Sequence, residues 1–130
     1  AVLFDNLQLL KAARIDRSRR IATALLQTGR YLVPGFDLSN TPAYLRLPVM
    51  TESRSTRNEA ISKMRAKHIM ASTLYPSTLR RIEGIDRHLV DPCDNFPGAE
   101  AVVERLFTLP THPYVSDRDV EAIVDCLAAG

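Results

Sequence analysis

The three lysines of this sequence are its most direct candidates for covalent chemistry, because a lysine amine can form a Schiff base with a carbonyl compound. Such a lysine needs surroundings that lower the pKa of its amine and a neighbouring group that moves its proton. Lys11, Lys63 and Lys67 each lie inside a helical pattern, and no catalytic constellation accompanies any of them. The lysines alone therefore do not predict an enzyme.

Histidine and cysteine side chains also form no pattern of a metal site or a nucleophile. The three histidines, His68, His88 and His112, are far apart, and none has a second histidine or cysteine at ligand spacing. We interpret Cys93 and Cys126 as reduced thiols of a cytoplasmic protein. With only five glycines, the sequence has no phosphate-cradling loop and no glycine-flanked serine.

An arginine-rich run at 17–20 (RSRR) is the segment with the best prospect of contacting phosphate groups. Asp16 offsets part of its charge, and no aromatic residues are interleaved with it for base stacking. The net charge of the chain is only +2, which implies no strong attraction to nucleic acid. We interpret the run as a solvated helix face and do not expect a nucleic-acid partner.

Length and composition are those of one ordinary globular domain. The chain has 130 residues, of which 45% are hydrophobic and 25% charged, values that argue against disorder. No apolar run approaches the ~20 residues needed to cross a bilayer, and the start lacks the basic-then-apolar order of a signal peptide. It begins without methionine and enters a helical pattern at once, which fits a truncated or processed start. We expect a cytoplasmic protein without membrane contact.

Residues 3–32 are predicted to form a long helix, because apolar residues recur at helical spacing. The stripe consists of Leu3, Leu7, Leu10, Ile21, Leu25 and Leu32. The charged middle at 14–20 allows either one continuous helix or two helices with a kink. A helix with apolar ends and a charged middle suits a connector between two packed bodies. We therefore divide the chain into a long interdomain-type helix at 1–32 and a small α+β domain at 33–130, which together are expected to form a single structural unit.

The small domain alternates strand and helix patterns. Strands are expected at 45–50, 69–75 and 107–111. Helices are expected at 57–68, 97–106 and 117–128. Three short strands with packed helices imply a two-layer α+β unit. Residues 76–96 show no clear period, so we expect a loop with about one helical turn there.

Local signals support the three helix starts. Thr56 with Glu59 and Ser116 with Asp119 have the spacing of capping boxes. Pro97 stands where proline is favoured at a first helical position.

Four short patterns in order resemble the C-terminal region of the DegT/StrS aminotransferases. The segment LRLPV at 45–49 matches the family's "R-x-P" strand, and LYPSTL at 74–79 matches its "Y-P-x-x-L" segment. The block FPGAEAVVERLFTLPTH at 96–112 matches an "F-P-x-A" helix followed by an "L-P" strand. The opening helix also resembles the family's long interdomain helix, with "Q-L" at 8–9 and "R-R" at 19–20. The resemblance covers nearly the whole chain.

This resemblance implies the small α+β domain of a fold-type I aminotransferase. The family's enzymes use pyridoxal phosphate and act mostly on nucleotide-linked keto sugars. Their large domain carries the cofactor and a reactive lysine, which lies in a serine- and glycine-rich segment before the long helix. Here nothing precedes that helix, so we expect this chain alone to bind no pyridoxal phosphate and to be inactive as a transaminase.

The resemblance also suggests residues that face the substrate. Tyr75 matches the tyrosine of the "Y-P" segment and is the best candidate, with Arg46 of the strand and His112 as weaker ones. Many relatives carry a histidine shortly after the "Y-P" segment, whereas this chain has Ser77-Thr78-Leu79 there. Arg46 fits a structural salt bridge equally well, and His112 fits a structural role at a strand end better.

Two interpretations remain open at this point. The chain is either a fragment of a transaminase, whose missing large domain is then its partner, or a stand-alone interaction or small-ligand module that reuses the fold. A stand-alone domain would need to cover the apolar stripe of its opening helix, and a homodimer through that helix would do so. Phosphate or nucleic-acid binding by the arginine run is a distant third.

Overall fold

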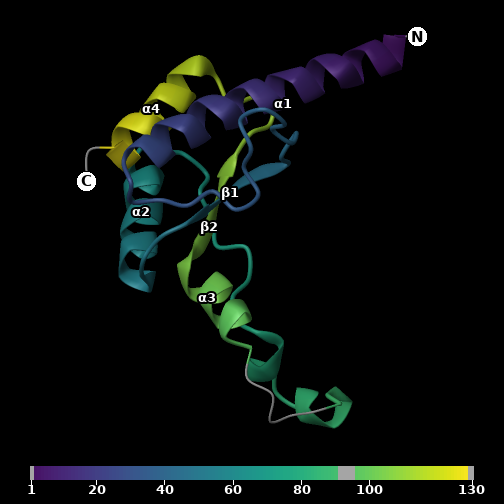
Figure 1. Cartoon of the computed structure of the whole chain (residues 1–130), viewed down its shortest axis with the longest axis vertical. Helices are drawn as coiled ribbons and strands as arrows, with labels where there is room; N and C mark the ends of the chain where they lie inside the picture. The colour runs from purple at the N-terminus through teal and green to yellow at the C-terminus, as the bar shows by residue number, and fades with distance from the viewer. Residues whose placement is uncertain (1, 91–95, 129–130) are drawn as a thin grey trace.

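A computed structural model describes residues 2–90 and 96–128, and it shows an α+β structure with helices packed around a short antiparallel sheet (Figure 1). The helices are α1 (Val2–Gln27), α2 (Arg54–Ala66), α3 (Pro97–Arg105) and α4 (Asp117–Ala128). The strands are β1 (Arg46–Met50) and β2 (Leu106–Pro110), and two short 3-10 helices are η1 (Leu79–Arg81) and η2 (Ile85–His88). Cys93 lies outside the described residues. Among the helices described, none has the length and apolar character to cross a membrane.

The two strands confirm the expected positions at 45–50 and 107–111 to within one residue. They pair antiparallel, with Leu47 opposite Leu109 and Val49 opposite Phe107. Burial alternates along β1, whereas all five residues of β2 are buried. A strand that is covered on both faces is mostly apolar, which explains why four of the five residues in LFTLP are apolar.

The third expected strand, at 69–75, is not a strand in the structure. This segment forms one isolated bridge, between Ser72 and Thr108 of β2. The Thr108 N–H donates to the Ser72 carbonyl at 2.8 Å, and the Ser72 N–H donates back at 3.2 Å. The nearby Met70 carbonyl accepts a hydrogen bond from the Arg46 side chain instead of from a strand partner. Pairing of this kind depends on distant residues, so alternation in the segment itself could not decide it.

The opening helix α1 is continuous and ends at residue 27 rather than at 32. Gly29 follows with a φ of 67°, the left-handed conformation that ends many helices. The Thr28 hydroxyl donates to the Leu25 carbonyl at 2.7 Å and satisfies one of the last carbonyls. Leu32 lies beyond the helix and forms a bridge with Met50 of β1. The expected apolar stripe therefore loses its last member.

The two halves of α1 differ in burial. Ile21 and Leu25 are fully buried, and this half packs against α4. The first half extends beyond the body of the molecule (Figure 1). Its exposed apolar side chains, called here the N-terminal apolar face of α1, are Val2, Leu3, Phe4, Leu7, Leu9 and Leu10. Their exposure ranges from 42% for Leu10 to 82% for Leu3, so no described part of the chain covers this face.

Helix α2 begins at residue 54 because Ser53, and not Thr56, is its N-cap. The Ser53 hydroxyl accepts a hydrogen bond from the Thr56 N–H at 3.1 Å. Glu59 does not reach back to the helix start, because its carboxylate pairs with Lys63 at 2.9 Å. The expected capping box of Thr56 with Glu59 is therefore wrong, although the helix itself is confirmed.

The end of α2 places His68 in a left-handed conformation, with a φ of 59°. The Ile69 N–H donates to the Met64 carbonyl, and the His68 N–H donates to the Arg65 carbonyl, both at 2.9 Å. This pair of bonds is the Schellman arrangement, in which His68 occupies the position usually held by glycine. Helix α2 therefore ends at Ala66, and His68 lies beyond it, whereas the expected helix at 57–68 included this residue.

Replacement of His68 with glycine is expected to raise the free energy of unfolding by about 0.5–1 kcal/mol. The left-handed conformation costs an L-residue about 1–2 kcal/mol, and glycine avoids this cost. The larger conformational entropy of glycine in the unfolded chain offsets part of the gain in stability. Urea unfolding followed by circular dichroism measures the change. His68→Ala serves as the control and is expected to give no gain. A glycine variant that is less stable than the original protein would contradict this account.

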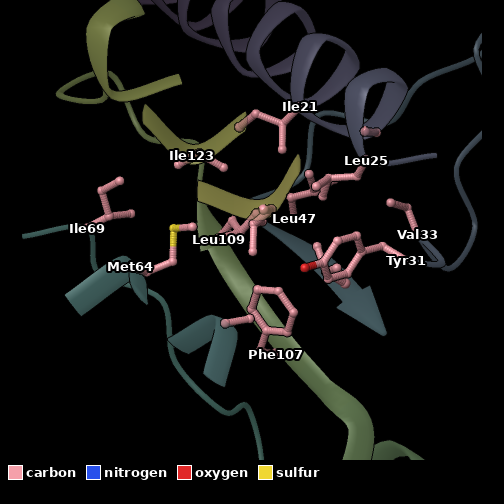
Figure 2. Packing of buried hydrophobic residues seen from close by; sticks show 14 of the residues in the cluster. Ile21, Leu25, Tyr31, Val33, Leu47, Met64, Ile69, Phe107, Leu109 and Ile123 are labelled. Atoms are coloured by element: carbon pink, nitrogen blue, oxygen red, sulfur yellow. The ribbon is translucent and has the colours of Figure 1, made fainter. Parts of the chain in front are cut away.

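Helices α3 and α4 confirm the expected ranges within one residue at each end. The Ser116–Asp119 capping box is also confirmed: the Ser116 N–H donates to Asp119 Oδ2 at 2.8 Å, and the Asp119 N–H donates to the Ser116 hydroxyl at 3.2 Å. The core lies between the sheet and helices α1, α2 and α4 (Figure 2). Phe107 is one of its largest side chains and is completely buried.

Candidate functional site

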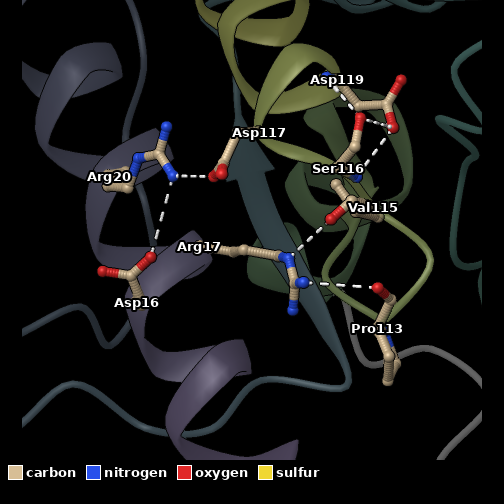
Figure 3. Close-up of polar contacts among 8 residues, drawn as sticks. All are labelled: Asp16, Arg17, Arg20, Pro113, Val115, Ser116, Asp117 and Asp119. Carbon is tan, nitrogen blue, oxygen red and sulfur yellow. Dashed lines mark hydrogen bonds and ion pairs between the residues drawn. The ribbon is translucent and has the colours of Figure 1, made fainter.

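The arginine-rich run at 17–20 holds α1 against the start of α4. Arg17 Nε donates to the Val115 carbonyl at 2.8 Å, just before the N-cap of α4 (Figure 3). Arg20 forms an ion pair with Asp117, the first residue of α4. Arg19 Nε also donates to the Thr41 hydroxyl at 3.4 Å. All three arginines of the run therefore have structural partners, and the run is more than the solvated face that we expected.

Arg46 ties the two strands to the segment that follows α2. Its Nε donates to the Thr108 hydroxyl at 2.8 Å, and its Nη2 donates to the Met70 carbonyl at 2.6 Å and to the Thr108 carbonyl at 3.1 Å. Burial lowers the pKa of the Arg46 guanidinium. These partners are neutral oxygens, and Arg46 forms no salt bridge with any residue that the structure describes. Its contacts are structural ones.

His112 follows β2 and lies beside a hollow of about 140 Å³ that His68 and Asp119 also line. Its Nδ1 is buried and has no hydrogen-bond partner among the described residues. The hydrogen bonds from Ser116 lower the pKa of Asp119, and the charge of His112 contributes less. Within the described part of the chain, no group of three or more histidine, cysteine, aspartate and glutamate residues could hold a metal ion.

Tyr75 lies in a different place, on the segment between α2 and η1. Its side chain is 55% exposed. It lines a hollow of about 210 Å³, called here the arginine cleft, together with Arg54, Arg57, Thr73, Pro76, Arg81, Val103 and Glu104. It also borders a more apolar hollow of about 440 Å³ along α3, where Ala99 and Val102 are among the lining residues.

Side-chain hydrogen bonds hold the walls of the arginine cleft together. Arg57 of α2 donates to the Val103 carbonyl in α3 at 2.5 Å. Arg81 of η1 pairs with Glu100 of α3 at 2.5 Å, and the Thr78 hydroxyl donates to the same carboxylate at 3.0 Å. The segment that carries Tyr75 is therefore anchored on α3.

The structure does not gather the three expected site residues in one place. Tyr75 and His112 line different hollows, and Arg46 lines neither of them. The arginines that do lie near Tyr75 were not expected. Arg54 and Arg57 are three residues apart and so share a helix face, which is a usable signal. Nothing in the sequence indicated that Arg81 would join them.

The matching family model is that of the DegT/DnrJ/EryC1/StrS aminotransferases, and it covers residues 2–128. The chain belongs to this family. No curated protein sequence is significantly similar to it.

Solved aminotransferase and related structures share the fold of this chain. The chain is similar to a DegT DnrJ EryC1 StrS aminotransferase from Brucella abortus, with a TM-score of 0.79, 23% identity and coverage of 97% of this chain and 32% of that chain. For the sugar aminotransferase CalS13 from Micromonospora echinospora, the TM-score is 0.79 at 12% identity, and the coverages are 98% and 32%. For NtdA from Bacillus subtilis, with bound cofactor PMP, the TM-score is 0.77 at 16% identity, and the coverages are 93% and 28%. The chain thus spans about a third of the length of these structures.

The described residues do not by themselves fit the pyridoxal cofactor that the family implies. That cofactor needs a lysine held in a pocket shielded from water. Lys11 is exposed on α1, Lys63 is paired with Glu59, and Lys67 is exposed at the end of α2. None of the three lines the arginine cleft.

Proposed function

We propose that this chain is the C-terminal domain of a pyridoxal-phosphate-dependent sugar aminotransferase, in which Tyr75 faces the substrate. The observation that carries the proposal is the family match over residues 2–128, in a chain that spans about a third of sugar aminotransferase structures. In this proposal a large domain supplies the lysine and the cofactor, so the chain is inactive alone.

The role of the chain is to bind and enclose the substrate. The Tyr75 ring presents an apolar face and its hydroxyl both donates and accepts hydrogen bonds, a combination that suits a sugar. Anchoring of the segment on α3, through Thr78 and Arg81, fixes the position of the ring. A fixed ring orients the sugar at a smaller loss of entropy when the complex forms.

The coding sequence directly upstream of this chain tests the proposal. We expect an open reading frame that continues into a large domain and contains a lysine in a serine- and glycine-rich segment. A stop codon directly upstream, with a start codon at the beginning of this chain, would contradict the proposal.

Pyridoxal phosphate added to the isolated chain is expected to give no specific, stoichiometric Schiff base. The reason is that Lys11, Lys63 and Lys67 lack a shielded pocket, so any labelling will be weak and spread among them. Borohydride reduction followed by peptide mapping measures the outcome, with a complete family enzyme as the positive control. Stoichiometric labelling of one of these lysines would disprove the claim.

A second candidate is a stand-alone module that associates with itself. The N-terminal apolar face of α1 favours it, because six exposed apolar side chains on one half-helix need a cover in water. A two-fold dimer is the simplest closed arrangement for a single self-complementary face.

A further inference from the structure

The arginine cleft carries more positive charge than its structural contacts use. Within the described ranges 2–90 and 96–128, three arginines from α2 and η1 line it, and Glu104 is the one lining carboxylate. Arg81 is paired with Glu100. Among the described residues, neither Arg54 nor Arg57 forms an ion pair with a carboxylate. The cleft therefore has a net positive charge at its α2 wall.

Arg57 is the most constrained of these side chains, with only 6% of its surface exposed. Its Nη1 donates to the Val103 carbonyl, and its Nε and Nη2 donate to Asn58 Oδ1 at 3.1 and 2.9 Å. A guanidinium has five N–H groups, so Nη1 and Nη2 each keep a second one. All of its partners are neutral oxygens, although an ionised group this deeply buried is normally paired with an opposite charge.

The surroundings of Arg57 add further positive charge around this buried guanidinium. Burial lowers the pKa of its guanidinium, and the charge of Arg54 lowers it further, while Glu104 opposes both weakly. Arg54 is the first residue of α2, and the first turn of this helix contains no acidic residue. The helix dipole is positive at that end and therefore has the same sign as both arginines. A bound anion would relieve this repulsion.

We infer that Arg54, Arg57 and Arg81 form a binding site for a phosphate or diphosphate group, placed directly beside Tyr75. Guanidinium groups bind such oxyanions through paired, charge-assisted hydrogen bonds. The cleft of about 210 Å³ has room for the group and for bridging waters. The inference rests on the proposed function only for the source of the group, which would then be the phosphorylated part of a sugar substrate. Anion binding by the chain itself can be tested separately.

Isothermal titration calorimetry of the full chain with inorganic pyrophosphate is the direct test. We expect saturable binding that weakens as salt is added, because the contacts are ionic. Arg54→Gln is expected to weaken it about tenfold, the effect of losing a charge-assisted hydrogen bond. Arg65→Gln is the matched control, because it removes the same charge from the exposed last turn of α2. The affinity of this variant for pyrophosphate is expected to stay within about twofold of that of the original chain. Without ligand, Arg54→Gln is expected to melt at a slightly higher temperature than the original chain.

The outcomes separate the two proposals. Absence of saturable pyrophosphate binding, or equal weakening by Arg54→Gln and Arg65→Gln, would overturn the site. If a nucleoside diphosphate binds more tightly than pyrophosphate, the natural ligand of the site is a nucleotide-linked compound. If pyrophosphate binds more tightly, the natural ligand is a free inorganic ion. Weaker binding of either ligand to the Arg54→Gln variant supports the site. A stop codon directly upstream would remove the aminotransferase proposal without touching these measurements.

Discussion

Replacing Phe107 with alanine is expected to lower the free energy of unfolding by about 3–5 kcal/mol. The side chain is completely buried on β2, where Phe107 lies opposite Val49, and it belongs to the core cluster shown in Figure 2. Its removal loses apolar burial and leaves a cavity that a two-stranded sheet cannot close easily. A loss of this size is a large part of the ~5–15 kcal/mol that stabilises a typical domain. Urea unfolding monitored by circular dichroism gives the value.

The matched control is Leu45→Ala, directly before β1. Leu45 is 76% exposed, so its truncation is expected to change stability by less than about 0.5 kcal/mol. If Phe107→Ala cannot be purified, Phe107→Leu keeps most of the volume and is expected to show a smaller loss. Equal stability of the original chain and the Phe107 variants would contradict the described core.

Replacing both Leu7 and Leu10 with glutamate is expected to convert a dimer of the isolated chain into a monomer. These leucines belong to the N-terminal apolar face of α1, and burial of each such side chain contributes about 1.5–3 kcal/mol. Across a two-fold interface both copies contribute, so the double replacement removes most of the driving force and adds like charges. Light scattering at micromolar concentration measures the mass.

Asn6→Glu with Gln8→Glu is the control pair, because it adds the same charge to the same half of α1 without removing an apolar side chain. It is expected to keep more of the association than the leucine pair. Helix content is expected to stay unchanged in both variants, since all four positions are exposed. If the original chain is a monomer at these concentrations, the prediction of self-association is wrong.

Local patterns determined the parts of this protein whose partners are close in sequence. The Ser116–Asp119 box fixes the start of α4 through bonds between residues three apart, and Pro97 marks the start of α3, so both helices could be placed from sequence. The strand at 45–50 was also predicted, from alternation that its burial then confirmed. Four short motifs in order were enough to indicate the family.

Only the tertiary structure decided features that depend on distant residues. Whether 69–75 pairs as a strand depended on which groups of β1 and β2 contact it. The Arg46 side chain donates a hydrogen bond to the Met70 carbonyl, which is therefore not paired with a strand. Burial divided α1 into a covered half and an exposed half, which its apolar stripe did not distinguish. The arginine cleft arises because the segment after α2 and helix α3 bring Arg81 and Tyr75 next to Arg54 and Arg57. Such convergence has no local signal, since the energy that produces it comes from packing between elements far apart in the chain.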